Sequence, residues 1–422
     1  MDRTEDGVAA AGPAPASPTA GRARAEALDA EDPLANFRAR FVIDDPALVY
    51  LDGNSLGRLP VATAERLATL VRDGWGGDLI RGWDGWLDWP ERIGDRIGTA
   101  LLGARPGETI VADSTSVNLY RLAAAALDAR PGRRTIVTDR DDFPTDRYVL
   151  EGLADAGGRT IRWIDGDATL GPTPDRVRVA LDEDVALLVL SHVNYRSAAI
   201  ADMASITALA HDAGALVIWD LCHSAGSVPV DLHGSGADLA VGCTYKYLNA
   251  GPGAPAFLYV RRELQASLRN PVQGWFGRRD QFAMGQGYEP EPGIRGWLVG
   301  TSPVLALAAV EEGVELAAEA GIEAIRAKGI ALTEYAIELV DVRLADVGCR
   351  VGSPRDAAGR GAHVSVRHPE ARRLCRELIE VGVIPDFREP DSIRLGLAPL
   401  YTRFVDVWDG IDRLRGLLTR GA

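Results

Sequence analysis

Long apolar runs are missing from this sequence. Its most apolar segments, such as Val185–Ser191 and residues 215–220, have the length of a buried strand and are too short to cross a bilayer. The N-terminus, which begins Met-Asp-Arg-Thr-Glu-Asp, has no apolar stretch of the kind found in secretion signals. Walker-type and GxGxxG loops are also absent, so these two kinds of phosphate site are not available. We expect a cytoplasmic protein that does not associate with a membrane.

Positive charge is scarce as well. Lys and Arg together number 46 against 60 Asp and Glu, a net charge of −14, whereas a nucleic-acid-binding protein concentrates basic residues on one face. No nucleic-acid partner is therefore expected. The four cysteines form no C-x-x-C pair and the histidines show no metal-ligand spacing, so no metal site is expected either. The simplest interpretation of Cys222, Cys243, Cys349 and Cys375 is four reduced thiols in a cytosolic protein.

The composition that remains is that of an ordinary globular protein, with 46% hydrophobic and 25% charged residues. In the middle of the chain, helical patterns at 143–156 and 202–213 fall between short apolar runs. These runs are rich in Leu or β-branched residues and predict strands at 135–138, 160–164, 186–191, 216–220, 239–242 and 256–260. Such alternation predicts an α/β fold with a mostly parallel sheet covered by helices on both faces.

After Pro303 the pattern changes. Helices are predicted at 304–320, 323–342, 370–380 and 404–418, with strands at 362–366 and 393–397. We read this part as a smaller α+β domain. The predicted organisation is a disordered tail at 1–31, a segment at 32–102 that packs partly on the small domain, a large domain at 103–302 and the small domain at 303–422.

Two residues of the central segment indicate the chemistry. Asp220 ends one apolar run and Lys246 follows another. Ligands of open α/β sheets bind beyond the carboxyl ends of the strands, so both side chains can face one crevice. Alone, each would be taken as a strand-end cap or a solvated loop residue, but their joint placement favours a pyridoxal 5′-phosphate (PLP) site. PLP needs a lysine that carries it as a Schiff base and a carboxylate that keeps its pyridine nitrogen protonated.

The phosphate of such a cofactor needs donors, and Thr115 and Ser116 stand where donors are expected. The run Asp-Ser-Thr-Ser-Val-Asn at 113–118 precedes an apolar helical pattern at 119–127. Hydroxyl side chains cap a helix start, and the free N–H groups and the helix dipole attract an anion there. A simple cap without a ligand is the alternative.

Three other residues are candidates for contacts with the cofactor or the substrate, and two of them also have a purely structural interpretation. Phe143, in Phe-Pro-Thr-Asp, can stack on a flat ring or can form a hydrophobic staple with Pro144 at the first helical position. His223 lies three residues after Asp220 and can touch the same ring. Arg394 stands in an apolar strand, where a guanidinium is costly unless it is paired. Its partner is either a substrate carboxylate or a structural Asp or Glu.

These motifs, in this order along the chain, resemble the kynureninase family. The most specific are Tyr-Leu-Asp-Gly-Asn-Ser-Leu-Gly at 50–57 and Cys-Thr-Tyr-Lys-Tyr-Leu-Asn at 243–249. The resemblance runs from about residue 36 to the C-terminus and also includes the motifs at 113–118, 143–146, 191–195, 219–224, 274–277 and 393–401. It implies PLP fold type I. Cys222 departs from it, since the family often has Ala there, and the segment at 81–89 is shorter than in bacterial members.

The resemblance also implies roles for residues. Lys246 and Tyr245 would be catalytic, and the substrate would meet Arg394, Asn54 and Trp83. The cofactor would be held by Thr115, Ser116, Phe143, Pro144, Thr145, Asp146, Ser191, Asp220, His223, Tyr245, Lys246, Trp275 and Thr301. The family is homodimeric, so Trp275 and Thr301 are expected to serve the partner's site.

The activity implied is hydrolysis of the Cβ–Cγ bond of L-kynurenine to anthranilate and L-alanine, in tryptophan degradation. Gly300-Thr301 matches the pair of family members that prefer kynurenine to 3-hydroxykynurenine. Two alternatives stay open from the residues alone. One is a cysteine desulfurase or aminotransferase on the same fold, and the other is a non-catalytic PLP-binding protein.

Overall fold

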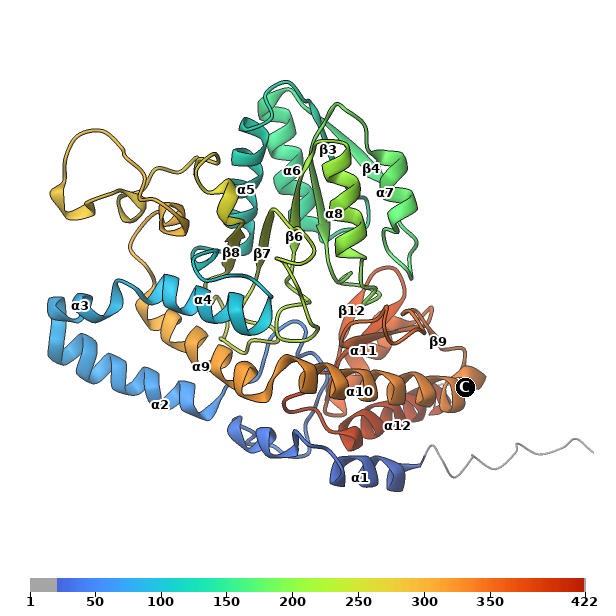
Figure 1. Cartoon of the computed structure of the whole chain (residues 1–422). Coiled ribbons are helices and arrows are strands. Elements are labelled where there is room, and N and C mark those ends of the chain that lie inside the picture. Colours follow the sequence, from blue (N-terminus) through green and yellow to red (C-terminus); the bar gives the residue numbers. More distant parts are fainter. Residues whose placement is uncertain (1–20, 421–422) are drawn as a thin grey trace, which may run out of the picture.

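The computed structural model describes residues 21–420 and is dominated by a seven-stranded sheet (Figure 1). The strand order is β2-β8-β7-β6-β5-β3-β4, with β8 antiparallel to both neighbours and the other pairs parallel. The strands are β2 Thr109–Val111, β3 Thr135–Asp139, β4 Thr160–Ile164, β5 Val185–Ser191, β6 Leu216–Asp220, β7 Leu239–Gly242 and β8 Phe257–Val260. The six strands predicted for this region are all present, with ends shifted by at most one residue.

Side chains of the central strands alternate between two cores, so both faces of the sheet are covered. On β6, Val217 and Trp219 pack into one core, whereas Leu216 and Ile218 pack into the other. The first core is completed by helices α4 Trp89–Leu101, α7 Pro174–Ala180, α8 Met203–Asp212 and α9 Val304–Ala320. The second is completed by α5 Thr115–Asp128 and α6 Pro144–Gly157. This is the covered, mostly parallel sheet that the uniformly apolar strands predicted.

A second, antiparallel sheet has the order β12-β13-β10-β9 and its own core. Its strands are β9 Arg350–Val351, β10 His363–Arg367, β12 Asp386–Arg388 and β13 Ser392–Gly396. The helices that share this core are α10 Ile322–Arg343, α11 Ala371–Glu380 and α12 Phe404–Arg420. Beside them, β1 Val49–Tyr50 pairs in parallel with β11 Val383–Ile384, which brings the N-terminal segment against the C-terminal part of the chain.

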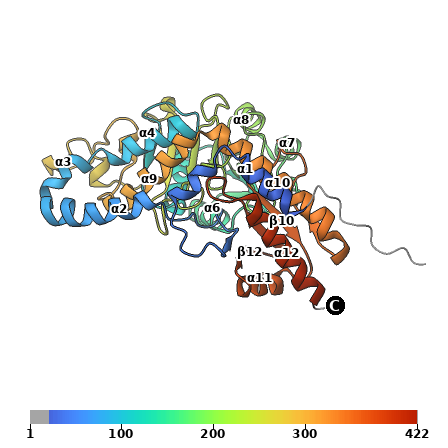
Figure 2. The same ribbon diagram turned by 90° about the horizontal axis from the view of Figure 1, so that it is seen from below.

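Helix α9 lies away from this second core. Its buried side chains Leu307, Val310 and Val314 belong to the first core of the large sheet. Figure 2 shows α9 beside α4 and α2 Val61–Thr69, far from α11 and α12. The sequence pattern placed this helix in the smaller domain because periodicity shows which face is apolar but not which core receives it.

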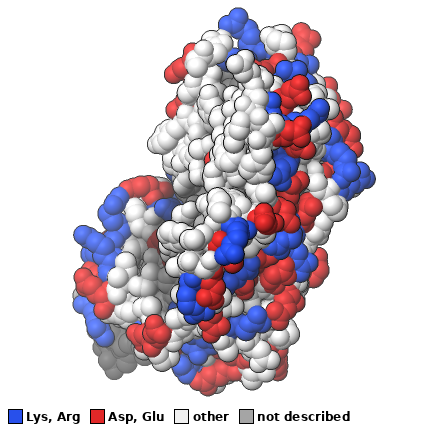
Figure 3. Space-filling model, turned by 90° about the vertical axis from the view of Figure 1, so that its left-hand side faces the viewer, with Lys and Arg blue, Asp and Glu red and all other residues white. Residues whose placement is uncertain are grey.

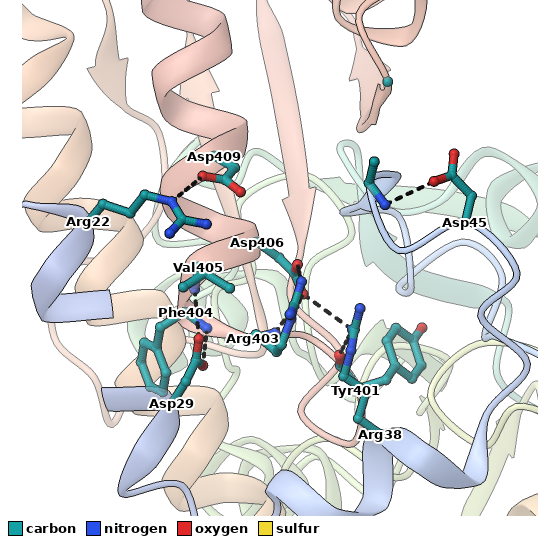
Figure 4. Close-up of polar contacts among 12 residues, drawn as sticks. Arg22, Asp29, Arg38, Asp45, Tyr401, Arg403, Phe404, Val405, Asp406 and Asp409 are labelled. Carbon is teal, nitrogen blue, oxygen red and sulfur yellow. Dashed lines mark hydrogen bonds and ion pairs between the residues drawn. The ribbon is translucent and has the colours of Figure 1, made fainter. Parts of the chain in front are cut away.

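The N-terminal segment contains a helix where disorder was predicted. That prediction is wrong for α1 Arg22–Ala30, whereas residues 1–20 lie outside the described residues. The carboxylate of Asp29 accepts hydrogen bonds from the backbone N–H groups of Phe404 (2.7 Å) and Val405 (3.1 Å), at the start of α12 (Figure 4). Ala25 is the one fully buried side chain of α1, so its apolar pattern is too weak to predict a helix. Contacts with α12 stabilise it instead.

The remaining elements are short. They are η2 Ala35–Arg40, the π-helical η3 Leu70–Asp78, η4 Leu79–Gly82, α3 Trp83–Trp86, η5 Arg262–Leu264, η6 Trp275–Gly277, η7 Gln281–Ala283, η8 Ile294–Trp297 and η9 Ala345–Val347. None of the helices between residues 21 and 420 has the length and apolar character needed to span a membrane.

Candidate active site

A cavity of about 130 Å³ lies at the carboxyl ends of the parallel strands. Ser191 and Asp220 end β5 and β6, while Tyr245 and Lys246 follow β7. Helices α5 and α6 point their N-termini at the same place. The lining residues are Thr115, Ser116, Phe143, Thr145, Asp146, Ser191, Asp220, Cys222, His223, Tyr245 and Lys246. Most of the predicted cofactor residues therefore line one cavity, and it lies where ligands of open α/β sheets bind, beyond the strand ends.

Lys246 is held at the centre of this cavity by a tight turn. The Lys246 carbonyl accepts from the Asn249 N–H (3.0 Å), and Asn249 has a φ of +54°. The lysine is 9% exposed, and its Nζ lies 3.4 Å from Nε2 of His223. Burial, followed by the charge of Lys246, holds the pKa of His223 well below its usual value, so the imidazole is neutral. Nζ also lies 5.8 Å from the centre of the Phe143 ring.

Buried carboxyl groups gather opposite the lysine. Asp220 Oδ1 accepts from the Cys222 N–H (2.6 Å), and Asp142 accepts from the N–H (3.0 Å) and the hydroxyl (2.5 Å) of Ser191. Burial raises the pKa of Asp142 to about 7. Burial, followed by the charges of Asp220 and Asp142, raises the pKa of Asp146 well above its usual value. Within residues 21–420, Asp146 Oδ2 is buried without a hydrogen-bond partner.

This cluster fits the protonated pyridine ring of PLP. Carboxylates crowded in a buried site repel one another, and a cation with an N–H donor bound beside Asp220 relieves that repulsion. Thr115 and Ser116 also line the cavity and stand at the N-terminus of α5, which suits a phosphate. Ser114 caps this helix by accepting from the Val117 N–H (3.4 Å). The described residues include no group of three or more side chains placed to hold a metal ion.

Arg394 was predicted to bind the substrate, with a structural ion pair as the alternative. In the structure it forms such an ion pair, with Asp386. Its guanidinium donates to both Asp386 oxygens (2.9 and 2.5 Å), to Ser55 Oγ (2.9 Å) and to the Tyr195 carbonyl (2.6 Å). With its amide oxygen turned toward Arg394, fully buried Asn54 lies 2.8 Å from Nε. Neither Arg394 nor Asn54 lines the cavity around Lys246.

Four other predicted residues also lie outside this cavity. Pro144 is the first residue of α6. Trp83 packs edge-on against Trp86 and Phe276, and Trp275 and Thr301 are exposed. Trp83, Trp275 and Thr301 are thus not brought to Lys246 within this protomer.

Sequence reasoning missed three residues that shape the site. Cys222 lines the cavity, Asp142 binds Ser191, and Asp386 pairs with Arg394. The sequence could have indicated Asp142, because it directly precedes the Phe-Pro-Thr-Asp motif at 143–146. Asp386 gave no signal, because its closeness to Arg394 follows from the pairing of β12 with β13.

Solved structures share this architecture. A cysteine desulfurase from Escherichia coli has a TM-score of 0.78 at 18% identity, covering 92% of this chain and 98% of its own. One from Thermococcus onnurineus NA1 has a TM-score of 0.77 at 18% identity, covering 94% and 98%. The protein C-DES, solved with glycine covalently linked to its PLP, has a TM-score of 0.74 at 18% identity, covering 88% and 96%. The chain therefore has the architecture of PLP fold type I.

Sequence relatives identify the family within that class. The kynureninase of Pseudomonas fluorescens is 47% identical over 402 residues, which cover 93% of this chain and 94% of that protein. The kynureninase of Burkholderia pseudomallei strain K96243 is 46% identical over 406 residues, covering 94% and 95%. Residues 325–414 match the family described as the kynureninase C-terminal domain. The chain belongs to the kynureninase family of PLP-dependent hydrolases.

Proposed function

We propose that this chain hydrolyses L-kynurenine to anthranilate and L-alanine in the cavity around Lys246. The observation that supports the proposal most directly is the buried lysine facing a cluster of carboxyl groups, in a chain 47% identical to a kynureninase. Bound there, PLP supplies an electron sink that stabilises negative charge developing on the substrate's carbon atoms. The protein's own task is to hold the cofactor, orient the substrate and move protons.

Each lining residue has a proposed part in this task. Lys246 would hold the cofactor covalently until the amine of the substrate displaces it, and its freed Nζ would then take and return the proton of the substrate's Cα. Asp220 keeps a proton on the pyridine nitrogen, and Phe143 stacks on the ring. Tyr245 donates a proton from its hydroxyl. The other proposed cofactor contacts are Thr115, Ser116, Pro144, Thr145, Asp146, Ser191 and His223.

Arg394 is proposed to bind the substrate's α-carboxylate. Its present partner is Asp386, whose two oxygens take the same paired geometry that a substrate carboxylate would take. Substrate binding therefore exchanges one carboxylate for another, and the buried guanidinium does not lose its charge partner. Asn54 and Trp83 are proposed to complete the substrate site.

The substrate preference is expected to favour kynurenine over 3-hydroxykynurenine. An amide side chain at position 301 could bind the ring hydroxyl, but this chain has Thr301 there. A pocket without that hydrogen bond discriminates modestly, so we expect specificity constants that differ by roughly 10- to 100-fold. Anthranilate fluorescence and 3-hydroxyanthranilate absorbance measure both rates on one preparation. A preference for 3-hydroxykynurenine contradicts the substrate assignment, and release of sulfide from cysteine without cleavage of either kynurenine contradicts the proposed function.

The desulfurase alternative has no support from the cysteines. A desulfurase needs an exposed, mobile thiol, and all four cysteines of this chain are buried. The same four unpaired thiols support the proposal that the protein works in the cytoplasm. The proposed division remains a large domain at 103–302 and a small one at 303–422, with α9 joining the small domain to the large core.

The protein is also proposed to be a homodimer. Figure 3 shows a broad uncharged area on the side that carries α3 and the segment around Trp275. A groove of about 680 Å³ near α3, called here the apolar face, is lined by Trp75, Leu79, Ile80, Trp83, Trp86 and Leu305, among others. Exposed apolar patches of this kind mark protein interfaces. A partner docked here can receive Trp275 and Thr301, which the cavity of their own protomer lacks.

Ile80→Glu is expected to break this dimer, because Ile80 is 78% exposed on the apolar face and a charge there would be buried by the partner. Sedimentation should change from the mass of two chains to that of one, and PLP affinity should fall with it. The control is Val179→Glu on α7, where the side chain is 87% exposed and outside the groove. A wild-type monomer, or a dimer unaffected by Ile80→Glu, would refute the proposed interface.

A further inference from the structure

Arg121 is a fully buried arginine inside α5, the helix whose N-terminus carries Thr115 and Ser116. Its Nη2 forms an ion pair with Asp113 Oδ2 (2.9 Å) and donates to Asn118 Oδ1 (2.5 Å), and its Nη1 donates to the Trp297 carbonyl (2.5 Å). A buried guanidinium is costly unless it is paired and hydrogen-bonded, and these three partners compensate its two Nη atoms, whereas Nε has no hydrogen-bond partner among the described residues. None of them is a ligand, so the residue has no part in the chemistry described above.

Two partners of Arg121 flank, in the sequence, the residues proposed to bind the phosphate: Asp113 precedes Thr115 and Ser116, and Asn118 follows them. Asp113 separates β2 from the cap residue Ser114 and has a φ of +47°, a left-handed conformation that is unfavourable for a residue other than glycine. This conformation turns the chain from the strand into the helix. It therefore sets the direction in which Ser114, Thr115 and Ser116 point. Strained backbone persists only where surrounding contacts hold it, and the ion pair with Arg121 is such a contact.

The third partner of Arg121, the Trp297 carbonyl, connects the Arg121–Asp113 ion pair to a distant part of the chain. Trp297 is buried in η8, and its ring packs in the same core as Leu119 and Leu122 of α5. The guanidinium thus bridges the β2–α5 turn, the first turns of α5 and η8. Moving the turn at Asp113 requires breaking its ion pair with Arg121, whose guanidinium is fully buried and would be left without a charge partner.

We propose that Arg121 and Asp113 are positioning residues for the cofactor phosphate: their ion pair holds the left-handed turn that aims Thr115, Ser116 and the N-terminus of α5 at the phosphate. The inference rests on the proposed PLP site. The inference predicts more than a loss of stability: a misaligned turn should weaken the binding of ligands that carry a phosphate and leave the binding of other ligands unchanged.

The test compares PLP with pyridoxal, which has the same ring and aldehyde but no phosphate. Apoprotein of the wild type, Arg121→Met, Arg121→Lys and Asp113→Asn is titrated with each ligand and followed by absorbance. Arg121→Met and Asp113→Asn should weaken PLP binding by roughly 10- to 100-fold, as expected for losing one hydrogen bond to a charged group. Their affinity for pyridoxal should stay within about twofold of the wild type. Arg121→Lys should recover part of the loss.

The matched control is Arg360→Met. Arg360 is also buried and paired, with Glu334 and the carbonyls of Pro354 (2.7 Å) and Arg355 (3.0 Å), but lies outside the cavity. Its loss should reduce thermal stability without changing the ratio of PLP to pyridoxal affinity. If Arg121→Met does not fold, Asp113→Asn still decides the question, because the Asp113 side chain is 36% exposed and tolerates substitution better.

Two results overturn the inference. One is an equal loss of PLP and pyridoxal affinity in the Asp113→Asn variant, and the other is no loss of either. A double variant Asp113→Asn/Arg121→Met that binds PLP about as well as Arg121→Met supports the pair acting as a unit. Failure of the proposed function is distinguishable, since wild-type protein would then not cleave kynurenine, and that measurement is independent of the ratio of PLP to pyridoxal affinity.

Discussion

Lys246→Ala is expected to lower kcat for kynurenine by at least roughly 10³-fold, within the range that positioned acid–base groups contribute. The variant loses both the covalent attachment of the cofactor and the group that moves the Cα proton. Wild-type protein should be yellow, and borohydride should fix its cofactor to the chain. The variant should show no reducible linkage. Absorbance spectra and intact mass after borohydride treatment measure both effects.

Lys328 provides the matched control, because the chain contains two lysines and both are buried. Lys328 Nζ lies 2.6 Å from Asp32 Oδ2, outside the cavity. Lys328→Ala should lower stability, since it leaves a buried carboxylate unpaired, but should keep the reducible linkage. Peptide mapping of reduced wild-type protein should place the cofactor on Lys246. Cofactor found on Lys328, or retained by Lys246→Ala, would contradict the assignment.

Arg394→Ala is expected to raise the KM for kynurenine by the equivalent of about 2–5 kcal/mol, or roughly 30- to 4,000-fold. The substrate's carboxylate would lose its paired hydrogen bonds in a buried site. Absorbance of the bound cofactor should remain near normal, because Arg394 does not line the cavity around Lys246. The effect on KM therefore separates Arg394 from the cofactor-binding residues.

Loss of the ion pair with Asp386 also lowers stability in this variant, so a control must lose an equivalent pair. Arg367 lies in β10 of the same sheet and donates to both oxygens of Asp391 (2.9 and 3.1 Å). Arg367→Ala should leave KM unchanged while thermal unfolding reports its structural cost. Equal KM values for Arg394→Ala and the wild type would show that Asp386 is the only carboxylate that Arg394 serves.

The covered, mostly parallel character of the large sheet and the placement of Asp220 and Lys246 at one cavity could be predicted from the sequence. Residues 216–219 and 239–242 are apolar at every position, which occurs in strands when helices cover both faces of a sheet. Parallel strands bring their carboxyl ends to one edge, so the positions of Asp220 and Lys246 after two such strands were sufficient to place them together. These inferences need only local patterns and a general rule of topology.

Short edge strands and the helix α1 could not be predicted, because their stability comes from partners distant in sequence. The strand β1 has two residues and exists through its pairing with Val383 and Ile384. Asp29 in α1 meets the N-terminus of α12 about 375 residues later. Neither stretch has an apolar period long enough to indicate an element.

The partner of Arg394 shows most clearly what the tertiary structure decided. The sequence indicated that a buried guanidinium needs a carboxylate, because an unpaired charge in an apolar strand is too costly. It left open whether that carboxylate belongs to the substrate or to the protein. The antiparallel register of β12 and β13 sets Asp386 directly opposite Arg394, and two strands nearly 5 Å apart bring their side chains into contact. The sequence alone thus determined that Arg394 needs a carboxylate partner. Strand pairing in the tertiary structure determined which carboxylate it is, because register depends on the whole sheet and not on the residues of one strand.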